Sequence, residues 1–127
     1  KVMGGVAEGE ALVSMDSVSF YGGVDPVTGI IVDPGHSCKG ENITGKVFVF
    51  PTGKGSTVGS YVIYRMAKLG TAHAAIINIE TEAILATGCV ISDIPLVDKL
   101  DQDPLKVIKN GMRVRVDADQ GKVEILD

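Results

Sequence analysis

The chain has 127 residues, of which 45% are hydrophobic and 22% charged, and these values fit one compact domain with a buried core. Twelve basic residues against sixteen acidic ones give a net charge of −4, so we expect no nucleic acid partner. No apolar run approaches the roughly 18 residues of a membrane span, and no signal-like segment opens the sequence. The sequence therefore predicts a single domain over residues 1–127, cytoplasmic and without a membrane partner.

The two cysteines, Cys38 and Cys89, are too far apart for a metal clip and too few for a disulfide framework. We expect reduced thiols, with Cys38 in a loop and Cys89 in the core. Sixteen glycines are nearly twice the usual share of about 7%, and short runs of Val, Ile, Leu and Ala separate them. This pattern favours strands over helices in a mixed α/β fold.

The first half of the chain predicts strands that end at glycine and proline turns. The clearest strand spans residues 45–50, where contiguous Val and Phe residues indicate burial on both faces. Shorter apolar patterns indicate strands at 10–14, 17–21 and 28–33, and residues 36–44 form a polar loop.

The second half predicts one long helix followed by short elements. A buried helical stripe is predicted over residues 57–69, and Gly70 supplies the helix end. Its members recur every three or four residues: Val58, Val62, Met66 and Leu69. The remaining predicted elements are a strand at 74–79, one or two helical turns at 81–87, an extended edge segment at 90–97, a short helix from Pro104, and a hairpin of 112–116 with 122–126.

The segment 51–60, between the buried strand and the long helix, is the expected site. Its glycines allow a sharp turn, while Lys54 and the free N–H groups of the helix start suit a bound phosphate or carboxylate. A Walker phosphate loop is excluded, because Phe48 stands where a glycine is required and Gly55 follows the lysine.

Ser56 lies at the predicted helix start and has two interpretations. Its hydroxyl can simply cap the helix, with the glycines serving the turn. Alternatively it is a proton acceptor or nucleophile, activated by Lys54 and the helix terminus, since an unaided serine is a weak base. Ser60, one turn later, is interpreted as a packing or surface hydroxyl rather than a second contact.

Three blocks of sequence together resemble the small subunit of the aconitase X family, and within it the archaeal members that dehydrate 5-phosphomevalonate. The blocks are residues 20–29, 45–47 and 51–60. The resemblance implies a swivelling β/β/α domain with a partly closed barrel-like β-sheet and few helices. It also implies a larger partner subunit that carries a [4Fe-4S] cluster.

The resemblance assigns roles within this sequence. It makes Ser56 the proton acceptor of a hydro-lyase reaction that removes water from 5-phosphomevalonate. The implied substrate contacts are Lys54, Gly55 and Thr57, together with Gly22, Gly23 and Asp25 as a second wall of the pocket. For that second wall an ordinary turn capped by Asp25 is the alternative. Thr52 departs from the family pattern, in which a serine is frequent.

The cysteine count independently supports this division of labour. An aconitase-type cluster needs three cysteine ligands, and this chain contains two. We therefore expect the large subunit to hold the cluster, no metal ligand on this chain, and no activity from this chain alone.

Two other functions stay open from the sequence. Residues 70–77 resemble the Thr-Ser-His-Ala-Ala motif of phosphohistidine swivelling domains, with His73 as the phosphoryl carrier, although Ala72 replaces the serine. A non-catalytic binding domain is the third class. His36 is expected in an exposed loop. Arg65, Arg113 and Arg115 could reach a phosphate, but the latter two alternate with valines and so fit the wet face of a strand.

Overall fold

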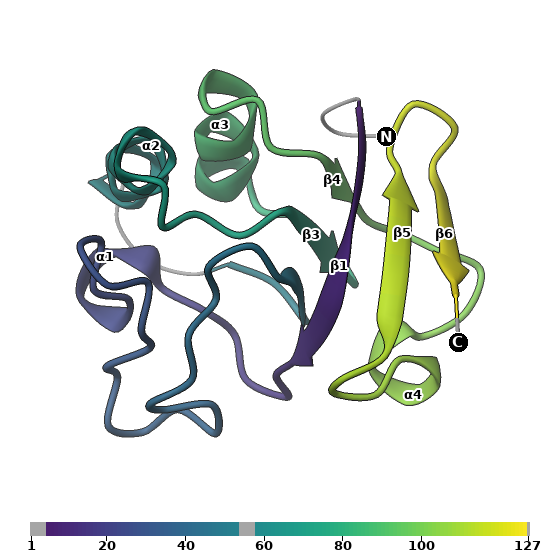
Figure 1. Cartoon of the computed structure of the whole chain (residues 1–127), viewed down its shortest axis with the longest axis horizontal. Helices are drawn as coiled ribbons and strands as arrows, with labels where there is room; N and C mark the ends of the chain where they lie inside the picture. Colours follow the sequence, from purple (N-terminus) through teal and green to yellow (C-terminus); the bar gives the residue numbers. More distant parts are fainter. Residues whose placement is uncertain (1–4, 54–57, 127) are drawn as a thin grey trace.

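A computed structural model describes residues 5–53 and 58–126 (Figure 1). Its centre is a six-stranded mixed sheet with the strand order β4-β3-β2-β1-β5-β6. The strands are β1 (Val6–Val13), β2 (Val47–Phe50), β3 (Ala75–Asn78), β4 (Leu96–Val97), β5 (Arg113–Asp117) and β6 (Lys122–Ile125). Strands β1 to β4 run parallel, whereas β5 and β6 are antiparallel to their neighbours. The curled sheet confirms the predicted partly closed barrel in a mixed α/β fold.

Four helices are present in the described part of the chain: α1 (Phe20–Gly23), α2 (Val58–Leu69), α3 (Ala83–Ile91) and α4 (Pro104–Val107). Helices α2 and α3 connect β2 to β3 and β3 to β4, as parallel strands require. Figure 1 shows α1, α2 and α3 together on one side of the molecule, and α4 near the strands β5 and β6 at its opposite end. No helix of the described residues is long and apolar enough to cross a membrane.

Alternate side chains of β2 belong to two hydrophobic cores, one on each face of the sheet. Phe48 and Phe50 belong to the core under α2 and α3, whereas Val47 and Val49 belong to the core inside the curl. All four residues of β2 are buried. This confirms the strand predicted over 45–50 and places its carboxyl end deep within the fold.

Several predicted elements are confirmed, among them the 74–79 strand, the helix after residue 57, the short helix at Pro104 and the C-terminal hairpin. The predicted strands at 17–21 and 28–33 are wrong. Val18 forms only an isolated bridge to Gly53, and Gly22 has φ 83°, so the chain turns into α1 instead. Ile30 likewise makes an isolated bridge, to Asn42.

The buried face of α2 differs from the prediction by about one residue. Ile63 and Met66 are fully buried, while Val62 is half-buried and Leu69 is 51% exposed. The difference arises from tertiary packing. Helix α3 lies against α2, so the buried residues of α2 are those that lie between α3 and the sheet. Helix α3 itself runs to Ile91, beyond the predicted turns, and it shortens the predicted 90–97 extended segment.

Candidate functional site

The candidate site begins where β2 ends and α2 starts. In a parallel sheet the carboxyl ends of the strands are the usual place for a ligand. The residues with the strongest predicted roles, Lys54, Gly55, Ser56 and Thr57, lie outside the described residues. Their roles stay predictions, and the structure locates the site through the residues on either side.

On the strand side, the turn after β2 is fixed from two directions. The Val18 N–H donates to the Thr52 carbonyl over 3.1 Å. A Cβ on Gly53 would lie 3.2 Å from both Glu82 Oε1 and Leu85 Cβ, so a side chain has little room there. Glu82 is itself fixed, because its carboxylate accepts the Leu85 N–H and thereby caps α3. The chain therefore enters the candidate site along a defined path.

On the helix side, α1 lies directly against the beginning of α2. A Cβ on Gly59 would be 4.0 Å from both Phe20 Cβ and Tyr21 N. Of the predicted substrate contacts, Gly22 is exposed with φ 83° and Gly23 is buried. The structure thus brings together the 20–29 and 51–60 blocks, which are some thirty residues apart in the sequence.

Asp25 closes the turn that follows α1. Its Oδ1 accepts the Val27 N–H at 2.9 Å, and its carbonyl accepts the Gly29 N–H at 2.8 Å. This is the turn geometry that the sequence offered as the alternative to substrate binding. A substrate role for Asp25 stays a prediction.

A hollow of about 430 Å³ lies beside the candidate site, at the carboxyl ends of β2 and β3. Thr52 and Glu82 line it, together with Thr81, whose N–H donates to Asp98. Ser60 is 7% exposed, and its interpretation as a packing hydroxyl stays a prediction. The sequence did not indicate Glu82, although a carboxylate before an apolar run is a recognisable helix-start signal.

His73 is sealed inside the core under α2. It is 3% exposed, its ring centroid lies 5.5 Å from that of Phe20, and neither ring nitrogen has a hydrogen-bond partner among the described residues. This burial lowers the pKa of His73 to about 3. A phosphoryl carrier must be accessible to its donor, so the phosphohistidine alternative is wrong for this fold.

His36 is also buried, contrary to the prediction of an exposed loop residue. Its Nδ1 accepts the Cys38 N–H at 3.0 Å, which leaves Nε2 to donate to the Ser14 hydroxyl at 3.1 Å. The loop is further held by the Ser37 N–H, which donates to Asp16 Oδ2. The polar segment 36–44 is thus fastened to the end of β1 instead of facing the candidate site.

The thiols of this chain do not suit an iron–sulfur cluster. Burial raises the pKa of Cys89 to about 12 and also raises the pKa of Cys38, so both favour the protonated form over the thiolate that binds metal. Cys38 donates to the Val13 carbonyl, and Cys89 is fully buried on α3. Across residues 5–53 and 58–126, no group of three or more His, Cys, Asp and Glu could hold a metal ion.

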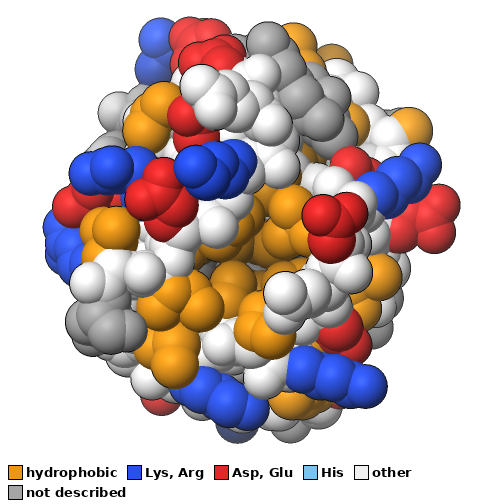
Figure 2. Space-filling view, turned by 90° about the vertical axis from the view of Figure 1, so that its right-hand side faces the viewer, with side chains coloured by type: hydrophobic (Ala, Val, Ile, Leu, Met, Phe, Trp, Pro, Cys, Tyr) orange, Lys and Arg blue, Asp and Glu red, His pale blue; other side chains and the backbone are white. Residues whose placement is uncertain are grey.

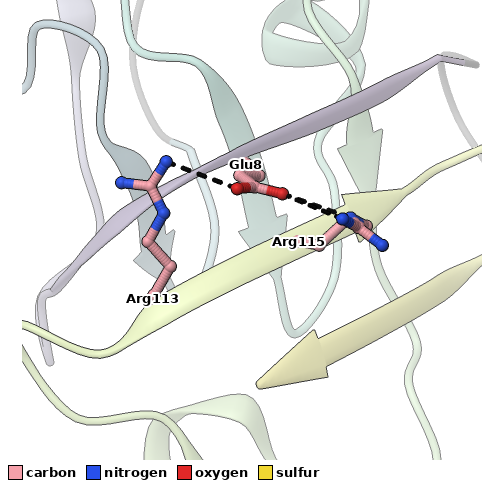
Figure 3. A network of polar contacts seen from close by, with 3 residues as sticks. All are labelled: Glu8, Arg113 and Arg115. Carbon is pink, nitrogen blue, oxygen red and sulfur yellow. Dashed lines mark hydrogen bonds and ion pairs between the residues drawn. The ribbon is translucent and has the colours of Figure 1, made fainter. Parts of the chain in front are cut away.

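The prediction that Arg113 and Arg115 lie on the solvent-exposed face of a strand, β5, is confirmed. Arg113 and Arg115 both pair with Glu8 of β1, at 3.4 and 3.2 Å, across the antiparallel ladder (Figure 3). Val114 and Val116, which alternate with them, are fully buried. These two arginines are therefore engaged at a distance from the candidate site.

Comparison with known proteins places this fold in a family. The family model of the aconitase X swivel domain matches residues 1–125. Phosphomevalonate dehydratase small subunits of Methanococcoides burtonii and Thermococcus kodakarensis are 60% and 58% identical, with 97% and 100% of this chain and 90% and 93% of those proteins covered.

Solved structures agree. The crystal structure of Thermococcus kodakaraensis aconitase X in its holo form superposes with a TM-score of 0.95 at 57% identity, covering 100% of this chain and 95% of that one. A protein structure solved by NMR in solution gives a TM-score of 0.90 at 48% identity, covering 99% and 95%. The chain therefore belongs to the aconitase X swivel domain family.

Proposed function

We propose that this chain is the small subunit of a heterodimeric phosphomevalonate dehydratase, a hydro-lyase of the archaeal mevalonate route to isoprenoids. The observation that carries the proposal is 60% identity over nearly the whole chain to a protein of that name. The whole chain, residues 1–127, would act as one swivelling domain. Its free cysteines suit the reducing cytoplasm.

The proposed reaction converts (R)-5-phosphomevalonate into trans-anhydromevalonate 5-phosphate and water. A base removes a proton from one carbon, and the electrons of that C–H bond form the new C=C bond. The hydroxyl of the neighbouring carbon departs and, with a proton, becomes the water released. The reaction therefore needs a proton acceptor on one side and assistance to the leaving hydroxyl on the other.

Ser56 is the proposed proton acceptor. Lys54 and the N–H groups at the start of α2 favour its ionised form, because both present positive charge. Lys54, Gly55 and Thr57 would also position an anionic group of the substrate, with Gly22, Gly23 and Asp25 completing the pocket. Support comes from the packing of α1 against α2, where a Cβ on Gly59 would lie 4.0 Å from both Phe20 Cβ and Tyr21 N.

The partner would be a large subunit that holds a [4Fe-4S] cluster, because such a cluster needs three cysteine ligands and this chain contains two cysteines. When bound, the cluster supplies a Lewis-acidic iron for the departing hydroxyl. The residues of this chain hold the proton acceptor and the anionic groups of the substrate. Neither subunit is expected to turn over substrate alone.

Ser56→Ala tests both the reaction and the base. The chain is mixed anaerobically with the large subunit of its own organism, and the anhydromevalonate product is measured by mass spectrometry. We expect turnover from the wild-type pair, none from either subunit alone, and a loss of at least about a hundredfold in Ser56→Ala.

The matched control is Ser92→Ala, because the Ser92 hydroxyl is buried without a partner among the described residues, on the far end of α3. It should keep near-normal turnover. No product from the wild-type pair would refute the proposed function. Normal turnover in Ser56→Ala would refute only the assignment of the base.

A further inference from the structure

The exposed aromatic residues of this chain gather on one surface, which we call the tyrosine face. It comprises Tyr21 of α1 with Tyr61, Tyr64, Arg65 and Lys68 of α2. The chain has three tyrosines, and all of them lie here, 58%, 69% and 40% exposed. Spacings of three and four residues place Tyr61, Tyr64, Arg65 and Lys68 along one stripe of the helix.

A groove of about 400 Å³ runs along this face, between α1 with its following turn and the second turn of α2. Its walls are mainly apolar and include Tyr21, Val32 and Tyr61, of which Val32 is 44% exposed. Arg65 is the charged residue at its border, and within the described part of the chain it has no ion pair or hydrogen bond. Tyrosine and arginine around a central apolar pocket are the residues that dominate binding energy at protein interfaces.

The charge of α2 contrasts with that of the whole molecule. The chain has a net charge of −4, yet Arg65 and Lys68 are the charged residues of α2 and both are basic. Lys68 already lies over the Tyr64 ring, 5.3 Å from its centroid, which leaves Arg65 as the cation that faces the groove. A partner surface complementary to this groove would be apolar and would carry a carboxylate opposite Arg65.

We propose that the large subunit docks on the tyrosine face, inserting apolar side chains into the groove and pairing a carboxylate with Arg65. The inference rests on the proposed function and identifies where its partner binds. The start of α2 adjoins the candidate site, and Gly22 lines both the groove and the predicted pocket. A partner that completes the site must therefore lie against this end of the molecule.

A second apolar hollow, of about 390 Å³, lies between β6 and α4 (Figure 2). It serves as the comparison surface for the groove on the tyrosine face. Its lining includes the apolar residues Val107 and Ile125 and charges of both signs, from Asp101 and Lys122. Figure 1 shows β6 and α4 at the opposite end of the molecule from α2. A partner bound only at this hollow would not reach the candidate site.

The test compares matched variants on the two surfaces. Arg65→Glu and Tyr61→Ser alter the tyrosine face, while Lys122→Glu and Ile125→Ser make the same kinds of change at the hollow. Each folded variant, checked by circular dichroism and Tm, is titrated against the purified large subunit by calorimetry, and turnover of phosphomevalonate is followed in parallel. We expect Kd to rise by about tenfold or more for Arg65→Glu and Tyr61→Ser, and by less than about twofold for the hollow variants.

Three results would overturn the inference, and each has a different meaning. Unchanged Kd in both tyrosine-face variants would show that docking occurs elsewhere, and weakened binding in the hollow variants would show where. Unchanged Kd with a raised KM in Arg65→Glu would make the groove a substrate subsite. No binding by the wild-type chain would remove the proposed function itself.

Discussion

His73 shows how a titratable residue behaves when the fold gives it no partner. Both ring nitrogens are buried without a hydrogen bond among the described residues, and the ring lies against Phe20. Charging this ring would leave an uncompensated cation in the core, so burial holds it neutral and lowers the pKa to about 3. The unfolded chain binds a proton at an ordinary pKa near 6.5, and stability is linked to that difference.

We predict that His73 makes the protein less stable as the pH falls from 6.5 toward 3. In this range the unfolded state binds the extra proton, and the loss amounts to about 2 kcal/mol at pH 5. His73→Leu should remove this contribution, so its free energy of unfolding should fall less between pH 7.5 and pH 5 than that of the wild type. Urea titrations at both pH values measure the difference, and equal losses in the two proteins would contradict it.

At the same scale, the sequence can indicate candidate site residues, but it cannot show which histidines the fold buries. Lys54 and Ser56 could be selected from residue type and position alone, because glycines, a cation and a helix start coincide there. The burial of His36 and His73 could not, since it depends on contacts with Ser14 and Phe20, which are distant in sequence. A histidine has the same local pattern whether it is exposed or sealed in a core.

The relation between α2 and α3 depends on a single glycine. A Cβ on Gly88 of α3 would lie 2.8 Å from Ile63 Cδ1 and 3.1 Å from Ser60 Cα. The Ile63 side chain can rotate away, but Ser60 Cα is backbone and moves only with α2. Because α2 starts next to the candidate site, the separation of these helices also sets where the described start of α2, at Val58, lies relative to the sheet.

We predict that Gly88→Ala destabilises the protein by about 1–2 kcal/mol, even though alanine is the better helix former. The added methyl group must push α2 away from α3, and we expect lower turnover in the complex as well. Thermal unfolding and the product assay measure the two effects. Gly35→Ala is the control, because its Cβ would meet only Asp33 Oδ1, at 3.6 Å. A Gly88→Ala protein as stable as Gly35→Ala would show that the helices have room to spare.

Elements with a strong internal pattern were predictable, and those defined by isolated contacts were not. The strand at β2 and the hairpin of β5 and β6 follow from apolar runs and a glycine turn. The segment 17–21 has the alternation of a strand, but Val18 finds only Gly53 as a bridge partner and Gly22 turns the chain. Tertiary partners therefore decided between strand and turn where local preference was weak.

For the whole molecule, the two thiols belong to the same hydrophobic core but to different parts of the chain. The core under α2 and α3 contains Cys89, a residue of α3 that is 0% exposed. Cys38 borders the same core at 7% exposure, but it belongs to the loop that His36 and Ser37 fasten to the end of β1. The two thiols thus report on different opening events of one domain.

We predict that a thiol reagent reaches Cys38 by local opening of its loop and Cys89 only by global unfolding. Releasing the loop breaks a few hydrogen bonds and exposes little surface, so the labelling rate of Cys38 should depend weakly on urea. Exposing Cys89 requires separation of α3 from α2 and the sheet, so its rate should rise with a slope close to the full m-value. Peptide mass spectrometry of the labelled wild-type protein separates the two sites without substitution. Equal slopes would mean that the 36–44 loop unfolds only with the core, and that its fastening to β1 is as strong as the sheet itself.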